Sequence, residues 1–293
     1  MISVLQHIGI IGEQTLLYLP LLFGSYLAIS LMQIPNLSIE GALIIGAIAG
    51  SSVYTGTNSH TLSLIAGLVC AAVSAGTVGV GAGLLHAYAK LSHLLSSIVM
   101  MGGIYGISLL LMHGSHRSLN PTDNHLNMLS IFTQYPAFVT LVILGIIISI
   151  LMCFFLKTKL GATCTVYGDN PRFLTNHRIS TPYIICVGLG LANALAGISG
   201  YLIAQHNSFI DTGMGAGIPL LCITALMLGK IFSSAHKPIV FVLPILGTVS
   251  YFSMQTILLL IGFDLHYFPL VQAAVLTVIF FTQRSRHDFT IGI

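Results

Sequence analysis

The chain has 293 residues, of which 55% are hydrophobic and only 6% are charged, and its formal net charge is +3. This composition excludes an ordinary soluble domain and is typical of a protein embedded in a lipid bilayer. The basic residues are scattered singly or in pairs rather than gathered in a stripe, which argues against a nucleic-acid partner.

Apolar runs of about 20 residues, the length that crosses a hydrocarbon core of roughly 30 Å, recur along the chain. They predict an all-α polytopic transmembrane helical bundle of about nine spans, built as a single domain over residues 1–293. We place the spans at residues 16–34, 38–55, 62–89, 94–112, 137–156, 183–204, 215–228, 238–261 and 269–282.

The distribution of lysine and arginine predicts the orientation, because basic short loops stay in the cytoplasm. With the N-terminus outside, only Arg117 lies outside, and the cytoplasmic side carries Lys90, Lys157, Lys159, Arg172, Arg178, Lys230, Lys237, Arg284 and Arg286. One span more or fewer among the first three would move the N-terminus but would leave the basic loop at 157–181 inside.

Small residues line the third and sixth predicted spans, and two segments are too polar or too rich in helix breakers to be continuous helices. The first is Ile34–Gly41, where Pro35 ends a helix and Asn36 or Ser38 can cap the next. The second is Gln205–Gly217. The similarity of the two small-residue spans is explained equally well by an internal duplication and by the general glycine content of membrane helices.

Broken segments at membrane depth are tolerated where they are buried in protein or line a wet cavity. We therefore predict a solute pathway along the third and sixth spans that includes Asn36, Ser38, Glu40, Asn193, Gln205 and Asp211. Each acid also has a simpler interpretation: Glu40 stabilises the start of a helix, and Asp211 lies in an outer loop.

The histidines and cysteines do not form a metal-binding pattern. His113, His116 and His125 share one predicted outer loop, while His86 and His93 are interpreted as polar groups at span ends. The five cysteines show no CxxC or Cys/His spacing and are interpreted as packing residues. No catalytic motif and no nucleotide-binding P-loop is present, so we expect no enzymatic activity, no metal and no cofactor in this chain.

The most informative segment is the predicted cytoplasmic loop. It reads Lys157-Thr-Lys-Leu-Gly161, then after six residues Gly168-Asp169-Asn170-Pro171-Arg172. This pattern resembles the permease subunits of bacterial ABC importers in the branched-chain amino acid and ribose permease superfamily. The tryptophan/tyrosine-type and uncharacterised permeases are most similar.

The resemblance covers residues 16–281 and includes the segments 35–41, 90–98, 193–205 and 211–229. The chain departs from the family pattern at Phe173–Ile179 and at Lys230, which stands where an acid is usual.

The resemblance implies the fold of a type II ABC importer permease in a bacterial inner membrane. It implies a coupling loop at about 157–181 that docks on a separate ATPase, and this partner binds ATP–Mg. The residues implied in docking are Lys157, Gly161, Gly168, Asp169, Asn170, Pro171 and Arg172. It also implies a second permease copy and a periplasmic or lipoprotein solute-binding protein.

The absence of an acidic or basic ring in the spans favours a small neutral or zwitterionic solute, such as an amino acid. Two alternatives remain open from the residues. One is a proton- or sodium-coupled secondary transporter that uses Glu40 or Asp211, and the other is a membrane-embedded scaffold protein.

Overall fold

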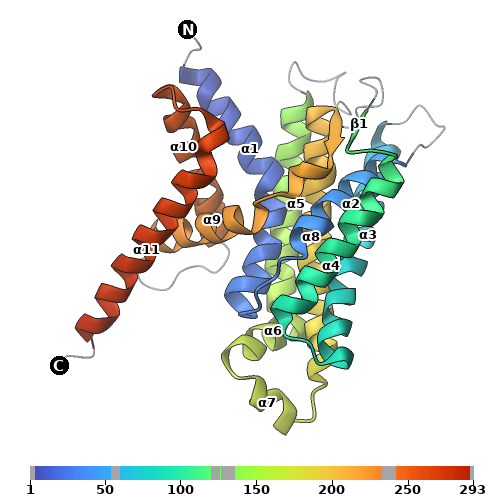
Figure 1. The fold of residues 1–293 in the computed structure, drawn as a ribbon, viewed down its shortest axis with the longest axis vertical. Coiled ribbons are helices and arrows are strands. Elements are labelled where there is room, and N and C mark those ends of the chain that lie inside the picture. The colour runs from blue at the N-terminus through green and yellow to red at the C-terminus, as the bar shows by residue number, and fades with distance from the viewer. Residues whose placement is uncertain (1–3, 54–59, 120–125, 127–135, 233–241, 291–293) are drawn as a thin grey trace. The chain divides into compact units, whose positions relative to one another are not determined.

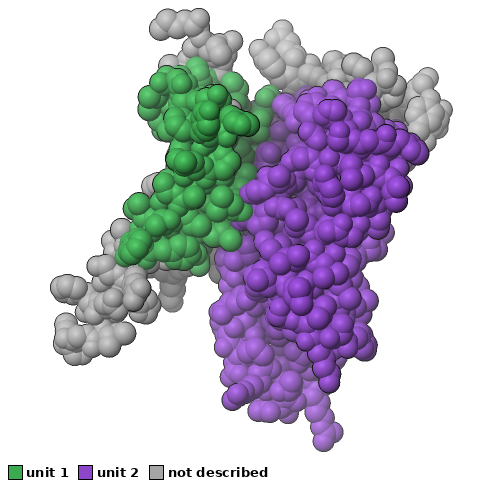
Figure 2. Space-filling view, in the orientation of Figure 1, with its two compact units in different colours: residues 1–15, 220–293 green, residues 16–219 purple. Residues whose placement is uncertain are grey.

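The computed structural model of the chain describes residues 4–53, 60–119, 126, 136–232 and 242–290, nearly all of which are helical. The chain divides into two compact units (Figure 2). Unit 2 comprises residues 16–219, and unit 1 comprises residues 1–15 and 220–293. The sequence predicts one domain, and hydropathy carries no signal for this division.

Unit 2 contains the longest helices and a small two-stranded sheet (Figure 1). The first helix, α1 (Val4–Ser25), enters unit 2 at Leu16 and continues as the π-helix η1 (Tyr26–Leu31). The remaining elements are α2 (Ile39–Ser51), α3 (His60–Ala89), α4 (His93–Met112), β1 (His116–Ser118), α5 (Pro136–Lys157), α6 (Lys159–Asp169), α7 (Pro171–Asn176), α8 (Thr181–Asn207), β2 (Phe209–Asp211) and the 3-10 helix η4 (Thr212–Gly215).

Besides the first part of α1, unit 1 contains three C-terminal helices. They are α9 (Ile218–Phe232), α10 (Val242–Leu260) and α11 (Phe268–Thr290), with the short η5 (Leu265–Tyr267) before α11. The backbones of α9 and α10 are in close contact, because a Cβ on Gly229 would overlap the Leu243 carbonyl. Tyr251 joins α10 to α11, since its ring meets Phe268 edge-on and its hydroxyl accepts a hydrogen bond from Gln272 Nε2.

Most described residues of the predicted apolar segments fall on helices. Seven helical stretches among the described residues are long and apolar enough to cross a membrane. The second and ninth predicted spans fall on shorter apolar helices, Ile39–Ser51 and Phe268–Phe281. At 1.5 Å per residue, α2 extends about 20 Å, less than a bilayer core. The bundle is therefore confirmed, but the count of nine spans is not. Residues 238–241 of the eighth predicted span, and Lys237, lie outside the described residues.

The core of unit 2 is the contact between α3 and α8. A Cβ on Gly79 of α3 would overlap the Leu189 carbonyl of α8, and one on Gly197 of α8 would lie 2.6 Å from the Ala71 carbonyl of α3. Glycines allow helix backbones to approach this closely in lipid. The small residues of the two predicted spans thus face each other, and in this conformation they are packed together without intervening side chains.

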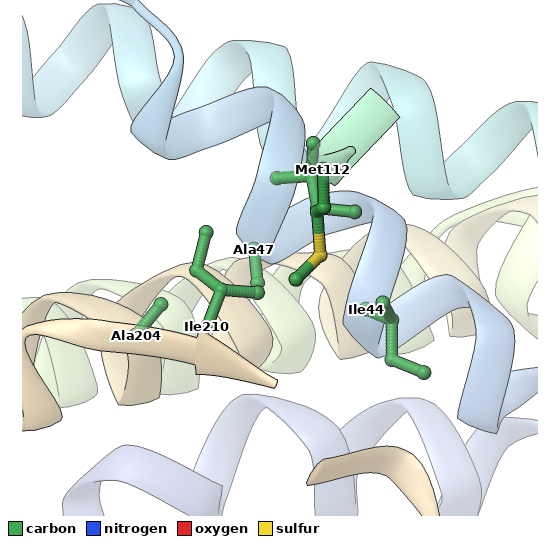
Figure 3. Close-up of a cluster of buried hydrophobic side chains, with 6 residues drawn as sticks. Ile44, Ala47, Met112, Ala204 and Ile210 are labelled. Atoms are coloured by element: carbon green, nitrogen blue, oxygen red, sulfur yellow. The ribbon is translucent and has the colours of Figure 1, made fainter. Parts of the chain in front are cut away.

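One end of unit 2 is closed by β1 and β2, which pair antiparallel with His116 opposite Asp211. Beneath them, Ile44, Ala47, Met112, Ala204 and Ile210 join α2, α4, α8 and β2 in a buried cluster (Figure 3). Figure 1 shows α6 and α7 at the opposite end of unit 2. Arg117 in β1 and the basic residues around α6 are therefore at opposite ends, as the positive-inside prediction requires.

Candidate translocation and coupling sites

The first predicted break in the helices is confirmed. The chain leaves η1 through two wide backbone hydrogen bonds, Met32 N to Leu27 O at 3.0 Å and Ile34 N to Ala28 O at 2.9 Å. It then runs without regular structure until α2 begins at Ile39, with Gln33 at a φ of 55°. π-helical turns often accompany functional sites because they insert an irregularity into an otherwise stiff helix.

Three predicted pathway residues meet in the interior of unit 2 and form a closed polar triad. Asn36 Nδ2 donates to Asn193 Oδ1 at 2.7 Å, Asn193 Nδ2 donates to Ser38 Oγ at 2.8 Å, and Ser38 Oγ donates to Asn36 Oδ1 at 2.7 Å. The three side chains are at most 3% exposed. Asn193 is near the middle of α8, so the triad joins the broken segment to the packed core at about half the depth of that helix.

The triad corrects one part of the sequence interpretation. Ser38 occupies the N-cap position of α2 but makes no side-chain cap, and Asn36 does not cap α2 either. The Asn36 carbonyl oxygen instead accepts from Ser38 N at 3.2 Å as well as from the Ser38 hydroxyl. In an apolar interior, three amide and hydroxyl groups that satisfy one another are more stable than one cap that leaves two of them unpaired.

Glu40 connects the two predicted breaks. It lies in the first turn of α2, and its Oε1 accepts a hydrogen bond from Gly217 N at 3.1 Å. Gly217 adopts a φ of 80°, and a Cβ on Gly215 would lie 2.8 Å from the Glu40 carbonyl oxygen. The carboxylate therefore has two roles: it stabilises the start of a helix, and it fixes the polar loop after α8 to α2.

Asp211 and Gln205 lie away from the triad. The second break is confirmed, because α8 ends at Asn207 and is followed by β2 and η4. Asp211 Oδ1 accepts from Gly213 N at 2.8 Å at the start of η4, and its Oδ2 is 3.9 Å from His116 Nδ1. Gln205 is buried in the last turn of α8. Solute contact by the six predicted pathway residues, from Asn36 to Asp211, stays a prediction.

A mainly hydrophobic cavity of about 170 Å³ lies between η1, α5 and α8, with Leu27, Met152 and Leu195 in its wall. All of its lining side chains are aliphatic, aromatic or thioether groups. Binding sites for polar small molecules combine apolar walls with a few placed polar groups. The cavity therefore lacks the groups that would orient a zwitterion, and the triad is the better candidate for solute contact.

The predicted cytoplasmic loop folds into two short capped helices. Thr158 caps α6, because its Oγ1 accepts from Gly161 N at 3.2 Å. Asn170 caps α7 by accepting from Phe173 N at 3.3 Å, and Pro171 takes the first helical position. Both are favourable helix starts. The Asn-Pro pair therefore ends α6 and begins α7, which gives the GDNP turn a structural explanation. We call residues 157–181 the coupling segment.

The coupling segment has an inward and an outward face. Gly161, Cys164 and Tyr167 are buried, and a Cβ on Gly168 would overlap the Leu31 carbonyl at the end of η1. The other predicted coupling residues are exposed: Lys157, Asp169, Asn170, Pro171 and Arg172. The sequence motif groups all seven coupling residues together. In the structure, Gly161 and Gly168 instead pack against neighbouring backbone, at Phe155 of α5 and Leu31 of η1.

Three exposed apolar side chains on the coupling segment were not selected from the sequence. Leu160 and Ile179 are 38% exposed, and Phe173 is 46% exposed. In the polar loop they flank the exposed Asp169–Arg172 run. Apolar residues inside a basic cytoplasmic loop are the sequence signal that could have identified them. A mixed apolar and charged surface of this kind is typical of a protein interface.

Broken helices in a polytopic bundle, a polar triad at mid-helix and a pair of capped helices at the basic end are features expected of a membrane permease. The comparisons agree. The family of the branched-chain amino acid transport system permease component matches residues 14–280, and the chain belongs to this family of ABC permeases. It is a multi-pass membrane protein.

Two relatives cover most of the chain. A tyrosine transport system permease protein of Clostridioides difficile (strain R20291) is 32% identical over 224 residues, which are 75% of this chain and 72% of the relative. An uncharacterized protein, RP368, of Rickettsia prowazekii (strain Madrid E) is 28% identical over 282 residues, which are 93% of this chain and 95% of the relative. No solved structure matches the chain significantly.

Proposed function

We propose that the chain forms the solute pathway of an ATP-driven importer in a bacterial inner membrane and that its coupling segment docks on a separate ATPase. The observation that carries this proposal is the outward face of α6 and α7. There, Asp169, Arg172 and Phe173 are exposed around the start of α7, and Leu160 is exposed at the start of α6. The chain has no P-loop of its own, so ATP–Mg would be bound by the partner.

The rigid anchoring of the coupling segment supports its role in transmitting force. Both helices have capped N-termini, and the close approach of Gly168 to the Leu31 carbonyl leaves no compressible side chain between α6 and η1. The segment after η1 leads to Asn36 and Ser38. A displacement of α6 would therefore reach the polar triad through one short stretch of chain, and opening of the triad would expose its amides to a solute.

The solute we propose is a small neutral or zwitterionic amino acid. The triad offers amide and hydroxyl groups without a net charge, which suits a solute whose own charges sum to zero. The tyrosine transport named for one relative agrees with this class. By analogy with ABC importers, a second permease copy and a secreted solute-binding protein would complete the assembly.

Co-purification from the native membrane tests the docking proposal. We expect a tagged wild-type chain to recover a Walker-motif ATPase and an Arg172→Glu variant to lose most of it. Arg117→Glu is the matched control, because Arg117 is an equally charged, exposed residue at the opposite end of unit 2. If neither wild type nor control recovers an ATPase, the importer proposal fails and the secondary transporter with Glu40 becomes the better interpretation.

A further inference from the structure

Three rings from three helices meet beside the coupling segment: His86 of α3, His93 of α4 and Tyr167 of α6. The imidazoles of His86 and His93 are stacked, with centroids 3.6 Å apart and planes inclined by 19°. His93 Nε2 lies 3.1 Å from the Tyr167 hydroxyl oxygen, and their rings meet edge-on at 87°. We call these three side chains the ring cluster. His93 lies in the family-like segment 90–98, but neither that segment nor the GDNP motif predicts these contacts.

The ring cluster is fixed at both ends. His86 Nδ1 is 2.7 Å from the Leu91 carbonyl oxygen, and because a carbonyl can only accept, Nδ1 carries a proton and donates it. This bond ties the stacked pair to the turn between α3 and α4, where Lys90 has a φ of 55°. At the other end, the Tyr167 hydroxyl is protonated at neutral pH, as any tyrosine is, and burial raises its pKa further.

The remaining contacts of α6 are made with other elements. Gly168 approaches the end of η1, and Cys164 lies near Gly188 of α8, where a Cβ would be 3.6 Å from the cysteine sulfur. The ring cluster supplies the attachment of α6 to α3 and α4. Without it, α6 would still contact α5, η1 and α8 but would lose this link to α3 and α4 and could shift against those two helices.

We propose that the ring cluster is a positioning device that joins α6 to the α3–α4 hairpin so that the two move as one body. The inference rests on the proposed function for its purpose, since a coupling helix must not slip against the helices that it drives. His93 and Tyr167 are the positioning residues, and His86 supports His93 from behind. Because α3 is packed directly on α8 at Gly79, a movement of the hairpin also moves the helix that carries Asn193.

The buried Cys164 thiol on α6 is a natural reporter of this attachment. In the full chain in lipid nanodiscs, with Ala at Cys70, Cys153, Cys186 and Cys222, the rate of alkylation by N-ethylmaleimide measures how often α6 lifts from unit 2. Tyr167→Phe keeps the ring and removes the hydroxyl. We expect the rate to rise about fivefold, the equilibrium shift that follows the loss of one hydrogen bond.

Three comparisons make this result specific. Tyr183→Phe removes a hydroxyl from a ring that is 55% exposed at the start of α8 and should leave the rate unchanged. His93→Gln, which retains polar groups, should raise the rate less than His93→Ala does. The midpoint of thermal unfolding should stay within about 2 °C of wild type for Tyr167→Phe, because a local opening does not unfold the bundle. An unchanged rate in Tyr167→Phe, or an equal rise in Tyr183→Phe, would overturn the proposal.

Joint movement is tested in the assembled complex. Spin labels at Ala162→Cys on α6 and Leu95→Cys on α4, both exposed positions, should keep one distance with and without a non-hydrolysable ATP analogue. In Tyr167→Phe the distance distribution should broaden when the analogue is added. If the analogue changes the distance between the two labels while the ring cluster is intact, joint movement is refuted. Failure to recover any ATPase refutes the proposed function instead, while the alkylation rates still decide whether the ring cluster holds α6.

Discussion

Replacing Asn193 by alanine removes the residue that closes the polar triad. Two hydrogen bonds are lost, from Asn36 Nδ2 at 2.7 Å and to Ser38 Oγ at 2.8 Å. Ser38 can still donate to Asn36 Oδ1, but the Asn36 amide is left buried without its acceptor. The change therefore removes two hydrogen bonds and leaves the donor of Asn36, a residue that is only 3% exposed, without a partner.

The magnitude follows from what each group loses. A buried polar group left unsatisfied costs about 1–3 kcal/mol, while hydrogen bonds within membrane bundles average about 0.6 kcal/mol and reach about 1.7 kcal/mol. We expect Asn193→Ala to lower the free energy of unfolding by about 2 kcal/mol. A double-mutant cycle with Asn36→Ala should give a coupling energy of about 1 kcal/mol, because the two amides bond directly.

Reversible unfolding in bicelles titrated with sodium dodecyl sulfate, followed by helical circular dichroism, measures these free energies. Ser199→Ala is the control on the same helix, since its hydroxyl donates only to the backbone carbonyl of Leu17. Its expected cost is about 0.6 kcal/mol. If Asn193→Ala costs no more than Ser199→Ala, or if the coupling energy with Asn36 is zero, the triad is not the stabilising contact that its geometry indicates.

Three further outcomes are expected. Gly168→Ala should lower stability by about 1–3 kcal/mol because its Cβ would overlap the Leu31 carbonyl, whereas Gly102→Ala, with open space around it, should be neutral or stabilising; thermal unfolding of both variants checks this. Burial raises the pKa of Cys164 from 9.0 to about 11, so its thiolate fraction at pH 8 falls about 100-fold. Alkylation of Cys164 should therefore be slow at pH 8, and a rate like that of a free thiol would contradict the burial. Glu40→Gln keeps an oxygen acceptor for Gly217 N and loses only the charge at the start of α2, so it should be less destabilising than Glu40→Leu, which should lose about 1 kcal/mol in the same unfolding assay.

The helical segments could be predicted because hydropathy reports directly on the environment of each span. The two breaks were also predictable, since Pro35 and the polar run before Gly217 are incompatible with continuous lipid-facing helices. The length of α2 was not: the predicted span starts at residue 38 and continues to 55, whereas α2 ends at Ser51, and no proline or charged residue marks that end in the sequence. Hydropathy measures what contacts lipid or protein and is insensitive to whether the backbone is coiled.

The pairing within the candidate sites could not be predicted. Asn36 and Asn193 were each selected from the sequence, but they bond across a separation of 157 residues, and no local pattern encodes such a contact. The same holds for Gly168, where the motif indicates a turn and the structure adds a backbone contact with Leu31. His93 lies in the family-like segment 90–98 and Tyr167 within the Lys157–Arg172 pattern, but neither pattern indicates that the two side chains meet, so their contact follows only from the helix packing.

The contacts of α6 explain why a helix of eleven residues can matter to the interior of unit 2. Its inward face meets η1 through a glycine, so the backbones of Gly168 and Leu31 are in contact and neither can yield by changing a rotamer. From Leu31 the chain runs through irregular backbone to Asn36, whose amide is bonded to α8. Irregular backbone is softer than a helix, yet here both of its ends are fixed. A displacement of α6 must therefore strain residues 32–38 or open the triad, and the triad holds neutral hydrogen bonds that water or a polar solute can replace.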